Sequence, residues 1–121
     1  MARANGKRYE ECLSGSWLAV RLGIDPVKID AMRREGELIA VREPDSTEWL
    51  YPAWQFSGTT PRRVVARVVS AAREAGLDES QLYDVLTGPR GIRGDARLVD
   101  LVLEGRDEDV VDAVRREGAA R

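Results

Sequence analysis

The stretch Leu22-Gly23-Ile24-Asp25-Pro26-Val27-Lys28-Ile29-Asp30-Ala31-Met32-Arg33-Arg34-Glu35-Gly36-Glu37-Leu38 decides the fold of the first half of the chain. It predicts a tight turn, a helix over residues 26–35 and an abrupt end. Asp25 can cap this helix, Pro26 suits its first position, and Gly36 supplies the left-handed residue that terminates it. A short helix after a glycine turn is typical of the second helix of a helix-turn-helix, although an ordinary helical hairpin shows the same pattern.

Helix 26–35 has one side suited to a core. Ile29 and Met32 lie three residues apart and can face inward together with Ile24 and Leu38. The other side chains then point outward or sideways, and Asp30 would accept a hydrogen bond from a cytosine amino group or repel wrong sites. Basic residues on this helix would contact phosphate or guanine. With one arginine of the following hairpin, the predicted DNA-contacting residues are Val27, Lys28, Asp30, Ala31, Arg33, Arg34 and Arg42.

The segments on either side of helix 26–35 complete a winged helix-turn-helix. Residues 13–22 predict a first helix, capped by Ser14 or Ser16 and ended by Gly23. Residues 38–42 and 49–51 predict two strands of a hairpin that forms a wing. The tip of this wing carries Glu43, Asp45 and Glu48, which phosphate would repel, so the wing is expected to serve mainly as structure.

The run from Leu13 to Tyr51 resembles the small winged helix-turn-helix of MerR-type and excisionase-like proteins. The matching residues are Ala19, Leu22-Gly23-Ile24, Ile29, Arg34-Glu35-Gly36-Glu37-Leu38 and Trp49 to Tyr51. The segment Tyr51-Pro52-Ala53-Trp54-Gln55-Phe56 resembles one found in actinobacterial antitoxin-like proteins. Pro52 there is expected to start a short helix or turn, with Trp54 and Phe56 as packing anchors.

Residues 58–121 predict a bundle of about four helices. After a linker at 57–60, Thr60 is expected to cap and Pro61 to begin a helix that runs to Ala75. Further helices are expected at 79–86, at 96–104 after an Asp95 cap, and from 107 onward. Apolar side chains beyond the main stripes, Val99 and Leu103 among them, exceed what so small a bundle needs. Part of this surface is expected to pack on the helix 61–75, and the remainder would be an exposed patch that marks a partner, unless the bundle buries all of it.

The segment from Leu86 to Val114 resembles the end of the toxin-binding domain of Xre/MbcA/ParS-type antitoxins. Val85-Leu86, Pro89, Ile92-Arg93-Gly94, Leu98, Leu101, Gly105 and Val110 fall into the positions of that pattern. The resemblance implies a partner-binding site at Ile92, Gly94, Leu98, Leu101 and Val110. It further implies an NAD-consuming toxin of the RES type as the partner, with its active site blocked by the antitoxin.

Composition limits the function classes. The chain has 43% hydrophobic residues, a net charge of −2, one cysteine and no histidine. Residues 1–57 carry 8 Lys/Arg and 9 Asp/Glu, so the DNA-binding half is not the basic body expected of a tight non-specific binder. Without histidine, zinc binding and His-based catalysis are not expected, so we expect no enzyme, no metal and no cofactor. The sequence has neither a membrane-length apolar run nor an N-terminal secretory region, which predicts a cytoplasmic, nucleoid-associated protein.

The predicted fold is therefore mainly α, with a winged helix-turn-helix, a two-stranded β-hairpin wing and a small C-terminal helical bundle. The predicted parts are a flexible tail (1–12), the DNA-binding domain (13–57) and a toxin-binding or dimerisation domain (58–121). The expected function is a DNA-binding transcriptional regulator, an antitoxin-like homodimer that inserts helix 26–35 into the major groove. Two alternatives stay open: a DNA-binding regulator or nucleoid-type protein whose tail only dimerises, and a protein-protein adaptor whose winged head does not bind DNA.

Overall fold

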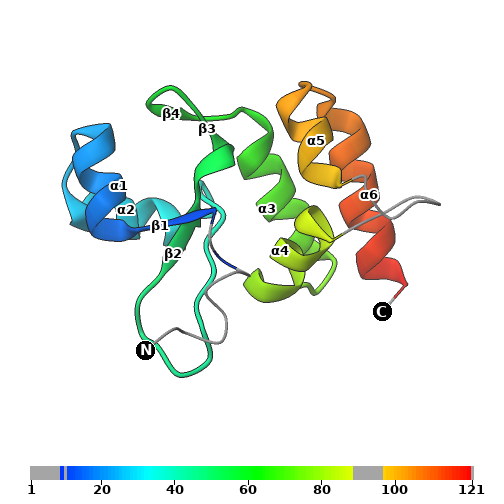
Figure 1. Ribbon diagram of the computed structural model, residues 1–121. Helices are drawn as coiled ribbons and strands as arrows, with labels where there is room; N and C mark the ends of the chain where they lie inside the picture. The colour runs from blue at the N-terminus through cyan, green and yellow to red at the C-terminus, as the bar shows by residue number, and fades with distance from the viewer. Residues whose placement is uncertain (1–8, 10, 89–96, 121) are drawn as a thin grey trace.

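The computed structural model describes residues 9, 11–88 and 97–120 (Figure 1). Within these ranges the chain is mainly helical with two small antiparallel strand pairs, which confirms the predicted fold class. None of the helices in these ranges has the length and apolar character that crossing a bilayer requires. In chain order the elements are β1 (Cys12–Ser14), α1 (Gly15–Leu22), α2 (Pro26–Arg34), β2 (Leu50–Pro52), η1 (Ala53–Gln55), β3 (Phe56–Ser57), β4 (Thr60–Pro61), α3 (Val64–Glu74), α4 (Glu79–Thr87), α5 (Leu98–Leu103) and α6 (Asp107–Ala119).

The pair α1 and α2 forms as the local sequence predicts. The Ser14 side chain accepts a hydrogen bond from the Trp17 amide (3.2 Å), so Ser14 and not Ser16 caps α1. Asp25 caps α2 by accepting from the Val27 amide (2.8 Å). Gly23 and Gly36 both adopt left-handed backbone, with φ of 71° and 81°.

The inner sides of α1 and α2 build the core of the head. Ile29 is 1% exposed, and Leu38 is buried beside it. Ile24 and Met32 are half-buried against the same cluster, as their spacing predicts. The cluster also contains Leu18, Ala19, Ala40 and Tyr51.

The strand predictions around the wing are partly wrong. Residues 38–40 form no strand, and Val41 makes an isolated bridge to Leu50 with backbone bonds of 2.9 and 2.7 Å. β2 pairs instead with β1, which the sequence assigned to the start of the first helix. The wing is consequently a loop over 42–49, held at its base by one bridge and projecting from the body (Figure 1).

A buried glutamine explains why residues 38–40 leave the sheet. Gln55 is fully buried and binds the backbone of Ile39 on both sides, accepting from its N–H (2.7 Å) and donating to its C=O (2.8 Å). The same amide donates to the Pro52 carbonyl (3.1 Å). A side chain therefore satisfies the backbone groups that a strand partner would otherwise bond.

The predicted start of the third helix is also wrong. β3 and β4 form a hairpin, so the expected linker at 57–60 is ordered structure and Pro61 lies in a strand. The Thr60 hydroxyl donates to the Ser57 carbonyl (3.2 Å) and so stabilises the turn instead of capping a helix. α3 begins three residues later, at Val64.

The C-terminal helices bury nearly all of their apolar side chains in one core. α3 packs mainly against α6, beside α5 (Figure 1). The core includes the apolar stripes Val65-Val68-Val69-Ala72, Leu82-Val85-Leu86 and Val110-Val111-Val114. Val99 is fully buried as well, whereas Leu103 is 49% exposed, so only Leu103 of these two contributes to an exposed patch. α5 begins at Leu98, and the predicted cap Asp95 lies outside the described residues.

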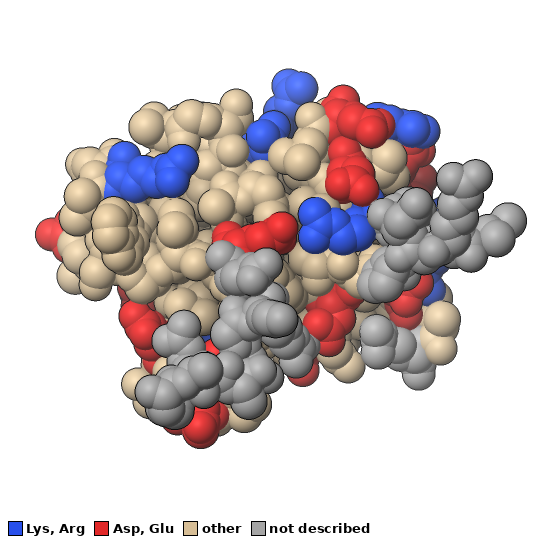
Figure 2. All heavy atoms as spheres, viewed as in Figure 1, with Lys and Arg blue, Asp and Glu red and all other residues tan. Residues whose placement is uncertain are grey.

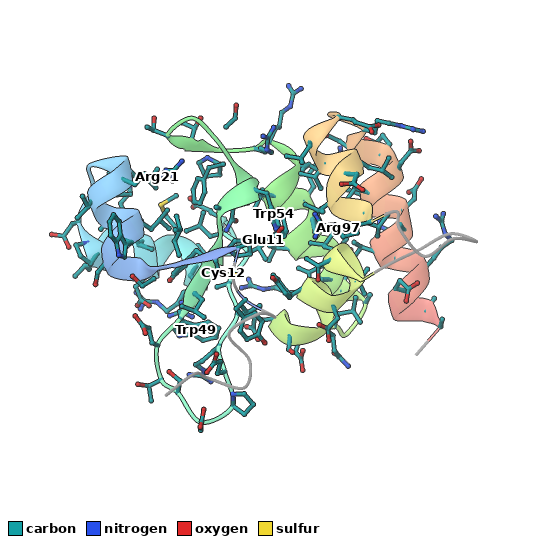
Figure 3. All side chains as sticks on the ribbon, in the orientation of Figure 1. Glu11, Cys12, Arg21, Trp49, Trp54 and Arg97 are labelled. Carbon is teal, nitrogen blue, oxygen red and sulfur yellow. The ribbon has the colours of Figure 1, made fainter. Side chains whose placement is uncertain are left out.

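The head and the C-terminal bundle share contacts, and part of the predicted N-terminal tail joins them. Tyr9 is buried and meets the Tyr83 ring of α4 edge-on at 5.3 Å. Glu11 forms an ion pair with Arg97 at 3.6 Å (Figure 3). The prediction of a flexible tail is therefore wrong at Tyr9 and Cys12, while residues 1–8 and 10 lie outside the described residues.

Candidate nucleic-acid interface

The outer side of α2 carries the side chains predicted to contact DNA. Val27, Ala31 and Arg34 recur at four- and three-residue steps, which places them on one line of the helix opposite buried Ile29. Val27 is 73% exposed, and Arg34 and Lys28 are exposed. On this line the apolar Val27 can contact a thymine methyl group, and the small Ala31 lets the DNA backbone approach closely. The guanidinium of Arg34 can bind a phosphate or a guanine.

Asp30 binds both arginines at the end of α2. One carboxylate oxygen accepts from Arg33 and the other from Arg34, three and four residues along the helix. The hydrogen bond from Arg33 is the main reason that the pKa of Asp30 lies below its ordinary value. Asp30 therefore stays ionised and offsets part of the positive charge that Arg34 presents to solvent.

Arg33 points toward the wing and not toward the outer side of α2. Its side chain is only 17% exposed, and its guanidinium carbon lies 4.3 Å from the centre of the Trp49 ring. Burial raises the pKa of the neighbouring Tyr51 hydroxyl, and Arg33 beside it acts in the opposite direction. Arg33 thus joins α2 to the base of the wing, so its expected role as a phosphate or guanine contact does not fit its position.

Arg42 lies against the same tryptophan. Its guanidinium carbon is 4.5 Å from the Trp49 ring centre, so Trp49 contacts two arginines through its π system. Figure 3 shows Trp49 at the base of the projecting loop. Stacking orients Arg42 and leaves the residue exposed, which keeps it available for a phosphate contact. The sequence predicted Trp49 as part of a strand. Its role in stacking against two arginines could not be predicted, because nothing in the spacing of these residues indicates that they meet.

The charge of the wing tip is as expected. Asp45 and Glu48 are exposed and Glu43 is half-buried. On the face seen in Figure 2, acidic side chains lie at the lower left, where the loop 42–49 projects. Phosphate would repel this tip, so the tip itself is unsuited to following a DNA backbone.

The outer side of α1 carries exposed apolar side chains that were not predicted from the sequence. Trp17 is 70% exposed and Val20 is 78% exposed, and with Arg21 they form one side of the helix at three- and four-residue spacing. Large apolar side chains rarely stand so exposed in neighbouring positions unless they meet a partner. The signal was available in the sequence, because Leu18, Ala19 and Leu22 already fill the inner side of this helix.

The residues predicted for partner binding in the tail are mostly inaccessible or undescribed. Leu98 and Val110 are buried in the bundle core, and Leu101 is half-buried against it. Ile92 and Gly94 lie outside the described residues. The described ranges also contain no group of three or more His, Cys, Asp or Glu side chains arranged to hold a metal ion.

Cys12 is half-buried, and burial raises the pKa of its thiol to about 11.

Comparisons with known proteins support the fold. No protein-family model and no curated protein matches the chain. Among solved structures, the chain is similar to one titled "NMR structure of Rv2175c", with a TM-score of 0.76 and 19% sequence identity. The match covers 88% of this chain and 80% of that one. At this identity the similarity establishes a common fold.

Proposed function

We propose that this protein is a DNA-binding regulator that presents the outer side of α2 to a major groove. The observation that carries the proposal is the line of exposed Val27, half-buried Ala31 and exposed Arg34 on a capped helix whose opposite side is fixed by buried Ile29. Such a helix offers base-contacting side chains from a rigid support, as helix-turn-helix proteins require.

Two roles are assigned to the cations around this line. Lys28, Arg34 and Arg42 contact phosphate or guanine, since all three are exposed. Arg33 holds the wing against α2 through Trp49 and contributes to DNA binding only indirectly. Because Asp30 and the acidic wing tip offset these charges, we expect moderate affinity that falls as the salt concentration rises.

The test is a fluorescence-anisotropy titration of a labelled mixed-sequence duplex at several salt concentrations. We expect Lys28→Ala/Arg34→Ala to weaken binding and to reduce the slope of log K against log salt by about 2, since each phosphate contact contributes about 0.9. Arg116→Ala is the matched control, because Arg116 is exposed on α6, away from the proposed interface. An unchanged slope in the double variant contradicts this docking.

A second candidate, the protein-protein adaptor, is favoured by the exposed Trp17 and Val20 of α1. In that case the wild-type chain fails to bind the duplex even at low salt. Trp17→Ser then weakens association with a protein partner and leaves the melting temperature unchanged, because an exposed side chain adds little to folding. Loss of duplex binding in Trp17→Ser would instead assign α1 to the DNA interface.

The finer proposal, an antitoxin for a RES-type toxin, rests on the resemblance of residues 86–114 to the antitoxin domain. Co-expression with a RES-type toxin tests it directly, since an antitoxin restores growth and retains the toxin during purification. A regulator or nucleoid-type protein whose tail only dimerises leaves growth arrested. Leu103→Asp separates a direct contact from an indirect one, because Leu103 is exposed on α5 and its loss leaves the core intact.

A further inference from the structure

We infer that the outer side of α3 is a two-fold interface between two copies of this chain. This side consists of Arg63, Ala66, Arg67, Ser70 and Glu74, all exposed, while the opposite side of the helix is buried in the bundle core. The inference goes beyond DNA binding, because it concerns a surface in the tail and is tested without DNA.

The charges at the two ends of α3 have no ion-pair partner within the described parts of the chain. Among the residues that the structure describes, neither Arg63 nor Glu74 takes part in a salt bridge or a side-chain hydrogen bond. Arg67, between them, is already paired with Glu108 of α6 at 2.8 Å. Two opposite charges therefore stand exposed at the ends of one helix face, too far apart to meet each other.

Both charges also have the wrong sign for the helix that bears them. Arg63 precedes the first turn of α3, where the helix dipole favours negative charge, and that turn contains no acidic residue and no side-chain cap. Glu74 is the last residue of α3, where the dipole favours positive charge. The start of α3 therefore lacks the negative charge that the dipole favours, whereas the last turn combines Glu74 with the favourable Arg73. An external partner that brings a carboxylate to the start of α3 would supply the missing charge.

An antiparallel second copy of α3 would provide an ion-pair partner for the charge at each end of the helix. Arg63 and Glu74 are eleven residues apart, which is about three turns plus 20°, so they lie nearly on one line about 16 Å apart. A two-fold axis through the middle of α3 places Glu74 of each copy at the helix start of the other. It places Arg63 of each copy at the other helix's end, so that the Arg63–Glu74 ion pair forms twice and each of the two dipole interactions also forms twice.

The surface between the charges suits a close helix crossing. Ala66 and Ser70 are small, and Arg67 between them is held toward α6 by its ion pair with Glu108, so two helix axes can approach along the side of Ala66 and Ser70. Beside them, a groove of about 310 Å³ runs between α3 and α6, with the buried Ala71 and Val111 on its floor. A contact over one helix and its flanking groove lies at the small end of stable interfaces, so we expect a weak dimer with a Kd of about 0.1 mM.

The experiment is sedimentation equilibrium of the full-length chain over a concentration series, without DNA. We expect a monomer–dimer equilibrium for the wild type. Arg63→Glu and Glu74→Arg should each weaken it tenfold or more, because each change replaces two attractive pairs by two repulsive ones. Arg116→Glu is the matched control, since it reverses an exposed charge on α6 outside the proposed face and should leave the equilibrium unchanged.

Mixing the two single variants provides the decisive measurement. In an equimolar mixture each carboxylate again faces a guanidinium across the two-fold axis, so a heterodimer should form with about the wild-type Kd. The double variant Arg63→Glu/Glu74→Arg should likewise recover self-association. A wild type that remains monomeric up to about 1 mM overturns the inference, as do single variants that dimerise normally and a mixture that stays monomeric. Failure of DNA binding alone has no bearing on any of these results.

Discussion

The helix α2 of the head and the helices α5 and α6 of the tail were all predicted to contact partners, yet the predicted contact residues differ in how deeply they are buried. α2 buries Ile29 and leaves Val27 on its opposite side 73% exposed. In the tail, Leu98 and Val110 lie inside the bundle core. An apolar side chain on an amphipathic helix therefore indicates a partner only when the chain's own core does not already cover it.

The difference follows from how many helices surround each one. α2 packs mainly against α1, and Arg73 of α3 donates a hydrogen bond to the Arg33 carbonyl near the end of α2, while Val27 on the outer side stays exposed. α6 lies against α3, α4 and α5, so every apolar side chain on its inner surface finds a neighbour within the bundle. A helix packed from one side keeps a free face, whereas a helix packed from several sides keeps only a polar one.

The largest expected effect tests the one-sided packing of α2. Ile29→Asp places an unpaired carboxylate in the head core and should lower the free energy of unfolding by about 4 kcal/mol, with a lower melting temperature. Val27→Asp, two residues earlier on the same helix, should change it by less than about 0.5 kcal/mol, because Val27 is exposed. Equal effects in thermal unfolding would show that α2 does not have a free outer side.

The next effect concerns the junction between the two regions. Gln55→Ala removes three buried hydrogen bonds and leaves the Ile39 N–H and C=O without partners, which should cost about 3 kcal/mol in urea unfolding. Thr59→Ala, on the exposed β3–β4 turn, serves as the control and should be nearly neutral. A neutral result for Gln55→Ala would mean that residues 38–40 do not depend on this side chain.

A smaller effect sharpens the comparison inside the tail. Val99→Ala should lower the free energy of unfolding by about 2 kcal/mol, because it leaves a cavity in the bundle core. Leu103→Ala, four residues later on α5, should cost less than about 0.5 kcal/mol, since that side chain is half exposed. Chemical denaturation measures the free energy of unfolding of both variants and so distinguishes a buried apolar residue from one available to a partner. A larger loss for Leu103→Ala than for Val99→Ala would contradict the packing of α5.

The smallest effect tests the start of α1. Ser14→Ala removes the hydrogen bond to the Trp17 amide and should cost about 1 kcal/mol. Ser16→Ala should be close to neutral, because Ser16 is exposed within the first turn and caps nothing. Thermal unfolding by circular dichroism measures both, and a larger loss for Ser16→Ala would move the helix start by two residues.

The sequence by itself determined the elements whose signals are local. α2 has a cap, a first-turn proline and a terminating glycine within twelve residues, and α4 has a capping box between Asp78 and Gln81. Their boundaries and inner sides were predicted because hydrogen bonds within one turn and contacts three or four residues apart decide them. The exposed outer side of α2 follows from the same periodicity.

Only the tertiary structure decided the features that depend on residues distant in the chain. β2 pairs with β1, 38 positions earlier, and Gln55 satisfies the backbone of Ile39 in place of a strand. Arg33 turns inward because Trp49 offers it an aromatic face, and Val99 is buried because the bundle closes over it. Periodicity predicts which side of a helix a residue occupies. Whether that side is buried or exposed depends on which distant segments of the chain pack against it in the folded structure.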